Sequence, residues 1–143
     1  MKKMTLGLVY GLFLFTAAAA VSQENAMAHY NRGNMHMGNY DYDLAIDEYT
    51  KAIKIAPDYY RAYFRRANAY FADQAFQKAI DDYSAAIRIK PDYAEAYFQR
   101  GVVYFHNGDI NKAIEDWKSV LKIEPDRVSA RRNIELACRY QQE

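Results

Sequence analysis

Apolar side chains recur along this chain with the period of an α-helix, in segments separated by short polar turns. Tyr63, Ala67 and Tyr70 follow the spacing i, i+4, i+7 and therefore share one helical face. After a short turn a second stripe of the same period follows, at Ala79, Ile80, Tyr83, Ala86 and Ile87. The pattern predicts two amphipathic helices that pack against each other across the turn.

This pair of stripes recurs every 34 residues. The clearest markers are Pro57, Pro91 and Pro125, each 34 residues from the next. Four further sets keep the same spacing: an alanine, an aromatic residue, a very small residue and an arginine. They are Ala45/Ala79/Ala113, Tyr49/Tyr83/Trp117, Gly33/Ala67/Gly101 and Arg32/Arg66/Arg100. A repeat of about 20 to 50 residues indicates a solenoid of stacked units.

The repeat divides the chain into an all-α series of helix pairs. Helices are predicted near residues 26–38 and 42–55, 60–72 and 76–89, and 94–107 and 110–123. The three repeats span residues 25–57, 58–91 and 92–125, and a proline ends the second helix of each. The very small residue lies on the packing stripe of each first helix, which predicts a close contact with the second.

Residues 126–143 continue the register with a last helix near 128–140. Glu135 and Arg131 replace the small and the aromatic residue at positions that would touch a following helix. A terminal element with a polar outer face is a solubilising cap. Val128, Ile134 and Cys138 are predicted to face the third repeat. Cys138 is the only cysteine, and a buried thiol is expected there.

The spacing, together with the recurring small, aromatic, alanine and proline residues, resembles the tetratricopeptide repeat family. The resemblance extends from Asn25 to Tyr140. It implies an α-solenoid of three helix-turn-helix repeats plus a capping helix, with a role in protein–protein interaction. The first repeat departs from the others, since His29 and His36 stand where the later repeats have tyrosines.

Residues 1–22 differ in kind from the rest. Lys2 and Lys3 precede an apolar run that ends in small residues, with no charge until Glu24. This order is typical of a secretory signal peptide and predicts export to the periplasm or secretion. The alternative is an uncleaved segment that anchors the chain in the membrane, since the run has the minimum length for a span.

Composition excludes some functions and leaves others open. The 143 residues are 51% apolar and carry a net charge of +1, so no electrostatic footprint for nucleic acid is present. The adjacent acids Asp47/Glu48, Asp81/Asp82 and Glu115/Asp116 recur on the polar side of the second helices, which predicts a solvated outer face. No catalytic constellation or phosphate loop appears. We therefore expect neither an enzyme nor a bound cofactor.

Methionines and histidines cluster in the first repeat, at Met27, His29, Met35, His36 and Met37. In an exported protein this composition raises the alternative of a copper carrier. The spacing favours packing instead, because His29 and His36 lie two turns apart, about 10 Å along the axis.

The remaining candidate is a groove on the first helices. Opposite the packing stripe, each first helix has a second stripe, and such stripes line the concave face of a solenoid. The predicted groove is rich in amides, basic at its centre and edged by aromatic rings. Its residues are Asn31, Asn34, Arg61, Phe64, Arg65, Asn68, Phe98, Gln99 and Val102.

A groove of this kind predicts a protein or peptide ligand. Arginine suits an acidic or C-terminal carboxylate group. Some co-chaperones of the family hold a peptide carboxylate in a clamp of Lys, Asn and Arg, and Asn31, Arg61 and Arg65 resemble part of it. The Lys/Asn pair of the preceding repeat has no counterpart. The alternatives are merely solvated residues on exposed helices and a structural repeat protein that associates with itself.

Overall fold

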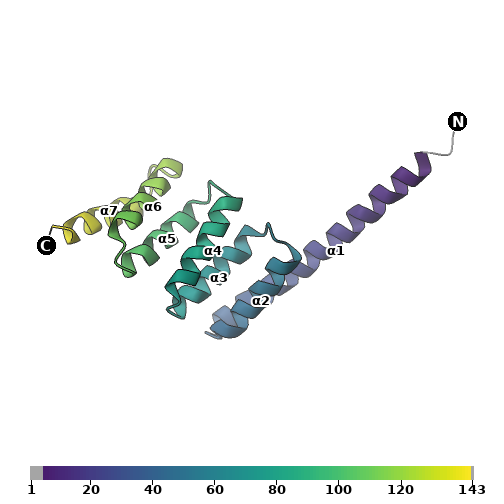
Figure 1. Ribbon diagram of the computed structural model, residues 1–143, viewed down its shortest axis with the longest axis horizontal. Helices are drawn as coiled ribbons and strands as arrows, with labels where there is room; N and C mark the ends of the chain where they lie inside the picture. The colour runs from purple at the N-terminus through teal and green to yellow at the C-terminus, as the bar shows by residue number, and fades with distance from the viewer. Residues whose placement is uncertain (1–4, 143) are drawn as a thin grey trace.

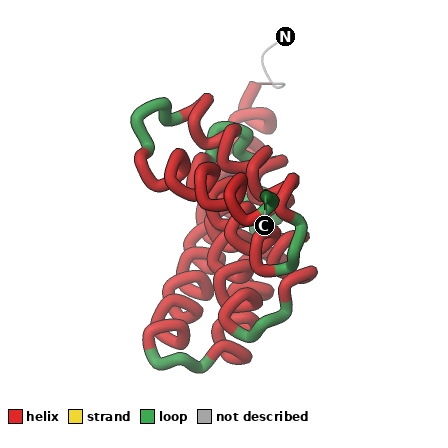
Figure 2. The backbone as a smooth tube through the Cα atoms, turned by 90° about the vertical axis from the view of Figure 1, so that its left-hand side faces the viewer, coloured by secondary structure: helices red, strands yellow, loops and turns green. Residues whose placement is uncertain are grey.

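The computed structural model describes the backbone of residues 5–142 and the side chains of residue 20 and residues 22–142. This part of the chain consists of helices and short turns and contains no strand (Figure 2). The helices are α1 (Thr5–Gly38), α2 (Tyr42–Ile55), α3 (Tyr60–Ala72), α4 (Phe76–Ile89), α5 (Ala94–His106), α6 (Ile110–Ile123) and α7 (Val128–Tyr140).

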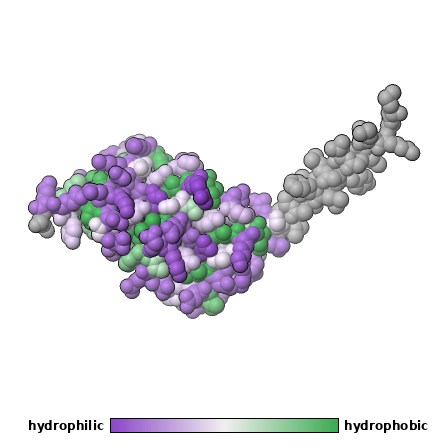
Figure 3. All heavy atoms as spheres, viewed as in Figure 1, coloured by the Kyte–Doolittle hydropathy of each residue, from purple (hydrophilic) through white to green (hydrophobic). Residues whose placement is uncertain are grey.

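The helices pack as consecutive pairs, α1 with α2, α3 with α4, and α5 with α6. Each pair also contacts the next, and α7 covers α6 at the end of the series (Figure 1). This confirms the predicted all-α solenoid of three helix pairs and a capping helix. On the face drawn in Figure 3, polar residues predominate over the described part of the chain, with apolar residues scattered among them.

Helix α1 is longer than predicted. It begins at Thr5 instead of near residue 26, so one helix continues from the N-terminal segment into the first repeat (Figure 1). The predicted signal peptide, residues 1–22, lies almost entirely outside the described side chains, and residues 1–4 lie outside the described backbone. Among the described residues, no helix combines the length and the hydropathy that a membrane span requires.

The small residue of each first helix faces the aromatic residue of its partner helix. A Cβ atom on Gly33 would come within 2.5 Å of the Tyr49 ring, and one on Gly101 within 2.7 Å of Trp117 Nε1. Ala67, in the equivalent place, is completely buried. The structure thus confirms the predicted close packing, which a larger side chain would prevent.

The aromatic residue is also held by a polar contact. The Tyr49 hydroxyl donates to Asn34 Oδ1 at 2.8 Å, and the Tyr83 hydroxyl donates to Asn68 Oδ1 at 2.5 Å. In the third repeat Trp117 Nε1 donates to the carbonyl of Phe98 at 3.2 Å.

One expectation about the outer face is wrong. Asp82 and Asp116 are only 6% and 5% exposed. Each accepts two hydrogen bonds from the arginine of its own repeat, Arg66 or Arg100, at 2.7–2.8 Å. One carboxylate of each adjacent pair is therefore an internal group, and only its neighbour, Asp81 or Glu115, is exposed to solvent.

The same arginines connect neighbouring repeats. Arg66 Nη1 donates to the Thr50 hydroxyl of α2 at 2.9 Å, and Arg100 Nη1 donates to the Ser84 hydroxyl of α4 at 2.8 Å. Each guanidinium also lies between two tyrosine rings, Tyr63 and Tyr70 for Arg66. The recurring arginine therefore ties three successive helices together.

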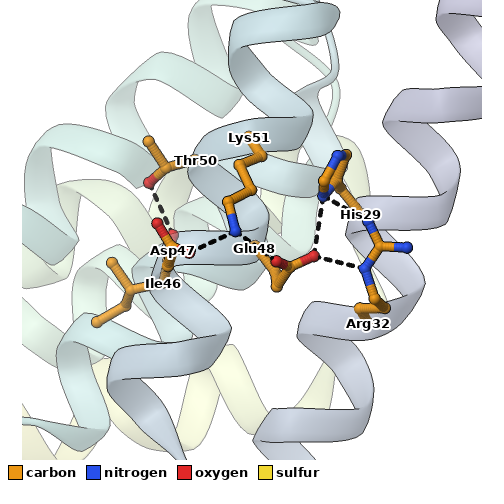
Figure 4. A network of polar contacts seen from close by, with 7 residues as sticks. All are labelled: His29, Arg32, Ile46, Asp47, Glu48, Thr50 and Lys51. Carbon is orange, nitrogen blue, oxygen red and sulfur yellow. Dashed lines mark hydrogen bonds and ion pairs between the residues drawn. The ribbon is translucent and has the colours of Figure 1, made fainter.

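The first repeat replaces this arrangement with a more open network (Figure 4). Glu48 Oε2 accepts from Arg32 Nε at 2.7 Å and lies 2.9 Å from His29 Nδ1. Lys51 Nζ reaches Glu48 Oε1 at 2.7 Å and also Asp47 at 2.6 Å. The Lys51 contact, followed by those of Arg32 and His29, lowers the pKa of Glu48 to about 2.

The cap packs in a different register from the predicted one. Ala130 and Ala137 are the buried residues of α7, and Ile134 lies partly buried beside them. Val128 and Cys138 are exposed, contrary to prediction. The alanines have the spacing of a helical face, and their small size lets α7 lie close to α6. Arg131 and Glu135 are exposed, as a polar outer face requires.

Candidate functional site

The predicted groove lies on the odd-numbered helices α1, α3, α5 and α7, and each of two pockets involves two of these helices. At the first end, a pocket of about 570 Å³ lies between α1 and the start of α3. Met27, Tyr59, Tyr60 and Arg61 are among its lining residues. At the other end, a pocket of about 120 Å³ lies between α5 and α7 and includes Val102 and Leu136. We call this surface the groove.

Two arginines of α3, Arg61 and Arg65, are exposed one helical turn apart, and Arg61 lines the first pocket. Arg61 Nε donates to the Tyr60 hydroxyl at 3.1 Å, and its guanidinium lies 5.6 Å from the centre of the same ring. Arg65 interacts with the Tyr30 hydroxyl of α1, a contact that raises the pKa of Arg65. Both side chains are therefore oriented by phenol groups.

Tyrosine rings surround these arginines. Tyr30 and Tyr59 lie 5.1 Å apart between ring centres, and Tyr60 and Tyr93 are separated by the same distance. Burial raises the pKa of Tyr93 to about 12, so this phenol remains neutral at physiological pH. The tyrosines thus give this end of the groove aromatic walls and neutral hydrogen-bonding groups.

Among the described residues, Arg61 and Arg65 differ from the other arginines of the first helices, Arg32, Arg66 and Arg100, in lacking an acidic partner. In the described part of the chain neither forms an ion pair. By contrast, Arg32, Arg66, Arg100 and Arg127 each contact a carboxylate. Two cations one helical turn apart, without counter-charge, create a local positive potential that favours an anionic ligand.

The third repeat neutralises its own charge. Arg127 Nη2 donates to Glu95 Oε2 at 2.5 Å, and Gln99 Nε2 donates to Glu95 Oε1 at 2.9 Å. The Arg127 guanidinium also stacks over Phe98, 4.4 Å from the ring centre. The predicted groove residues Gln99 and Phe98 are therefore engaged within the chain, and the basic character of the groove is concentrated on α3.

The asparagines of the predicted groove fall into two kinds. Asn31 is exposed on α1. Asn34 and Asn68 accept the tyrosine hydroxyls with their side-chain oxygens, which leaves their NH₂ groups as donors. Val102 takes the place of these asparagines in the third repeat and lines the smaller pocket.

Phe64 is wrongly assigned by the sequence prediction. Its ring is buried in the core and lies 5.6 Å from Tyr83 and 5.1 Å from Tyr93 between ring centres. The Phe64 ring therefore packs in the core against Tyr83 and Tyr93 and does not form the edge of the groove. The sequence analysis missed Tyr59 and Tyr93, although each stands two residues after a repeat proline and the pair recurs with the period.

The Met/His cluster of the first repeat is dispersed by the fold. His29 Nδ1 faces Glu48 Oε2 on α2, whereas His36 Nδ1 lies 3.9 Å from Asp41 Oδ2 at the far end of α1. Met35 is exposed. Within the described residues, no group of three or more His, Cys, Asp or Glu side chains converges on a point that would hold a metal ion.

Comparison with known families gives three matches along the chain. A family model described as "Tetratricopeptide repeat" matches residues 26–59, and a second with the same description matches residues 94–127. A model described as "TPR repeat" matches residues 67–108. A search of curated protein sequences gives no match.

Solved structures provide similar chains. The first TPR of Spaghetti (RPAP3), bound to the HSP90 peptide SRMEEVD, is 28% identical, with 85% of this chain and 96% of that chain covered and a TM-score of 0.81. The second TPR domain of human RPAP3, in complex with the HSP70 peptide SGPTIEEVD, is also 28% identical, with 81% and 97% covered and a TM-score of 0.77. The Sgt2 TPR domain from Aspergillus fumigatus is 29% identical, with 82% and 80% covered and a TM-score of 0.76.

Proposed function

The chain belongs to the tetratricopeptide repeat family, and we propose that it acts as an adaptor that binds a peptide segment of a partner in the groove. The ligand presents an acidic or C-terminal carboxylate group to Arg61 and Arg65. We assign the chain no catalytic step and no cofactor.

The observation that carries this proposal is the pair of arginines on α3 that have no carboxylate partner among the described side chains. The other arginines of the first helices, Arg32, Arg66 and Arg100, are each held in a contact with a carboxylate of the chain itself. Arginine donates its hydrogen bonds in a planar fork that matches a carboxylate. Arg61 and Arg65 offer that fork on α3, and the amide of Asn31 on α1 is exposed as well.

The similar structures support the same ligand class. The peptides named with two of them, SRMEEVD and SGPTIEEVD, both end in Glu-Glu-Val-Asp. They therefore carry acidic side chains and a terminal carboxylate at one end. One part of the clamp that the family resemblance implies, the Lys/Asn pair of a preceding repeat, has no counterpart here, because helix α1 continues in its place. The arginines offered to the ligand are therefore those of α3.

We further propose that the adaptor works outside the cytoplasm, in the periplasm or as a secreted protein. The basic start and apolar run of residues 1–22 support export. The alternative location is the membrane surface, with that segment retained as an anchor. Sequencing the N-terminus of the protein from its host distinguishes the two, because cleavage would give a chain that starts between Ala20 and Asn25.

The groove is tested with the peptide SRMEEVD, labelled at its N-terminus, and the same peptide with an amidated C-terminus. We expect Arg61→Ala/Arg65→Ala to weaken binding of the free acid about ten- to a hundredfold, since charge-assisted hydrogen bonds contribute about 1.5–3 kcal/mol. The matched control is Asp81→Ala/Glu115→Ala, which removes two exposed charges from α4 and α6. The arginine variant should melt like the unmodified chain.

Several outcomes would contradict the proposal. Failure of the unmodified chain to bind either peptide is the first of them. Equal binding of the acid and the amide would assign the contact to the acidic side chains and not to the C-terminal carboxylate. A loss of affinity in the control variant but not in the arginine variant would place the ligand on another face. Added salt should weaken binding of the acid, because exposed charges are screened.

A further inference from the structure

An exposed apolar patch with acidic neighbours lies at the turn between α1 and α2. Tyr40 is 77% exposed and Leu44 is 53% exposed. Together with Asp41, Asp43 and Asp73 they line a shallow hollow of about 350 Å³ that also includes Tyr42. We call these residues the Tyr40 patch. Exposed apolar side chains with a polar rim are typical of a protein contact surface.

The other two repeats show that this composition is not required by the fold. Tyr40, Gln74 and Gly108 occupy the same place in the three turns, with φ angles of 64°, 60° and 85°. Such positive φ angles favour glycine, and a bulky side chain is uncommon there. An exposed tyrosine at this position therefore gains nothing from the backbone or from burial.

Leu44 departs from its equivalents in the same way. The second and third repeats have Lys78 and Lys112 at this position, and each ammonium group covers a tyrosine ring, Tyr70 or Tyr104. The first repeat has His36 in place of that tyrosine and an exposed leucine in place of the lysine. Only this turn is both apolar and acidic.

The acidic groups of the patch are not neutralised nearby. Within residues 5–142, Asp43 and Asp73 have no cationic partner, and Asp41 Oδ2 lies 3.9 Å from His36 Nδ1. The patch therefore combines uncovered apolar surface with negative charge. A complementary surface must provide apolar contact and cations.

The outer side of α7 has that complementary character. Val128, 72% exposed, shares it with Arg131, Arg132, Glu135 and Arg139. Ala130 and Ala137 on the inner side bury the helix against the third repeat. Arg132 and Arg139 have no acidic partner in the part of the chain that the structure describes. Three arginines against one glutamate leave this face positive, and arginine stems add apolar surface.

We propose that the Tyr40 patch of one copy of this chain binds the outer face of α7 of a second copy. The two surfaces cannot meet within one molecule, because the Tyr40 patch lies at the turn between α1 and α2, beside the end of α3, and the other surface belongs to the last helix (Figure 1). Their opposite charges and exposed apolar residues make a head-to-tail contact between copies complementary. Neither surface includes Arg61 or Arg65, so this inference stands independently of the proposed peptide binding.

The contact has two measurable properties. It joins different surfaces of the two copies, so association continues from copy to copy and the mean size grows with protein concentration. It also depends on exposed charges, so salt weakens it. Association driven by the apolar residues near the N-terminus would respond to salt in the opposite direction.

The test is sedimentation velocity of the full chain over a range of concentrations, with two charge-reversal variants. Arg132→Glu/Arg139→Glu and Asp43→Lys/Asp73→Lys should each raise the dissociation constant at least tenfold. An equimolar mixture of the two variants should associate again, because each then offers the surface that the other has lost. The N-terminal segment is common to all samples and cannot cause these differences.

A matched pair of single variants isolates the apolar part. Tyr40→Gly removes the ring at a position whose φ angle suits glycine, so folding is preserved while association weakens. Gln74→Gly makes the same backbone change in the second repeat and should leave association unchanged. A chain that stays monomeric at high concentration, a mixture that does not recover, or equal effects of the two glycine variants would overturn the proposal.

Discussion

Arg66 and Asp82 are joined by two parallel hydrogen bonds, from Nε to Oδ2 at 2.7 Å and from Nη2 to Oδ1 at 2.8 Å. Both side chains are largely buried, and the remaining Arg66 nitrogen, Nη1, donates to Thr50 in the preceding repeat. Arg100 and Asp116 repeat the geometry 34 residues later. The recurring arginine is therefore a structural tie, in contrast to Arg61 and Arg65 on the groove side.

Removing the carboxylate of this tie should strongly destabilise the chain. We expect Asp82→Asn to lower the free energy of unfolding by about 3 kcal/mol, because it leaves a buried guanidinium without counter-charge. Asp81→Asn is the matched control, since the side chain of Asp81 is exposed. This change should alter the free energy of unfolding by less than about 0.5 kcal/mol. Urea unfolding followed by circular dichroism measures both. Equal losses would mean that the ion pair is not what stabilises this site.

A second prediction concerns Gly101. A Cβ atom there would lie 2.7 Å from Trp117 Nε1, in the contact between α5 and α6. We expect Gly101→Ala to cost about 1–3 kcal/mol through overpacking, despite the better helix propensity of alanine. Gly38, at the end of α1, has nothing within 4 Å of the corresponding position. Gly38→Ala should therefore be neutral or slightly stabilising in the same thermal melts.

The sequence was sufficient to predict the helices because the repeat supplies three copies of each signal. Helices α2, α3, α4, α6 and α7 begin and end at the predicted residues. The start of α1 was missed because the prediction treated residues 1–22 as a separate signal segment. The helical backbone nevertheless continues through that boundary.

The candidate site was predictable only in part. Helical spacing places Arg61 and Arg65 on one stripe, but it does not reveal which arginines are paired. Asp81 and Asp82 are adjacent and chemically alike, yet only the one that faces the Arg66 side is buried. Phe64 was misplaced because the side chain of a residue at the edge of a helical stripe can face either the core or the groove. Its neighbour Tyr93, from the following repeat, covers it.

The alanines of α7 illustrate the same limit. The prediction assigned Cys138 to the buried side, whereas Ala137 is buried and Cys138 is exposed. A single helix with few large apolar residues gives a weak periodic signal, and the contact surface of α6 decides the register. A rotation of the helix about its axis then brings Ala137 to the buried side in place of Cys138.

The last prediction concerns acid stability and Glu48. Lys51, Arg32 and His29 surround this carboxylate at 2.7–2.9 Å and lower its pKa from 4.5 to about 2 (Figure 4). Because the folded pKa is below the unfolded one, the stabilisation is fully present above about pH 4.5 and is lost as the pH falls toward 2. Lys51 and Arg32 are exposed, so the contribution is about 1 kcal/mol.

The measurement is urea unfolding of the unmodified chain and of Glu48→Gln between pH 6 and pH 2. The variant keeps the shape of the side chain and removes its charge, so the groups that do not contact Glu48 titrate alike in the two proteins. We expect the difference in the free energy of unfolding to be largest at pH 6 and to shrink steadily below pH 4.5. Glu115→Gln, on the exposed side of α6, is the control and should show no comparable trend. A difference that stays constant down to pH 2 would mean that Lys51 and Arg32 do not hold Glu48 in its charged form.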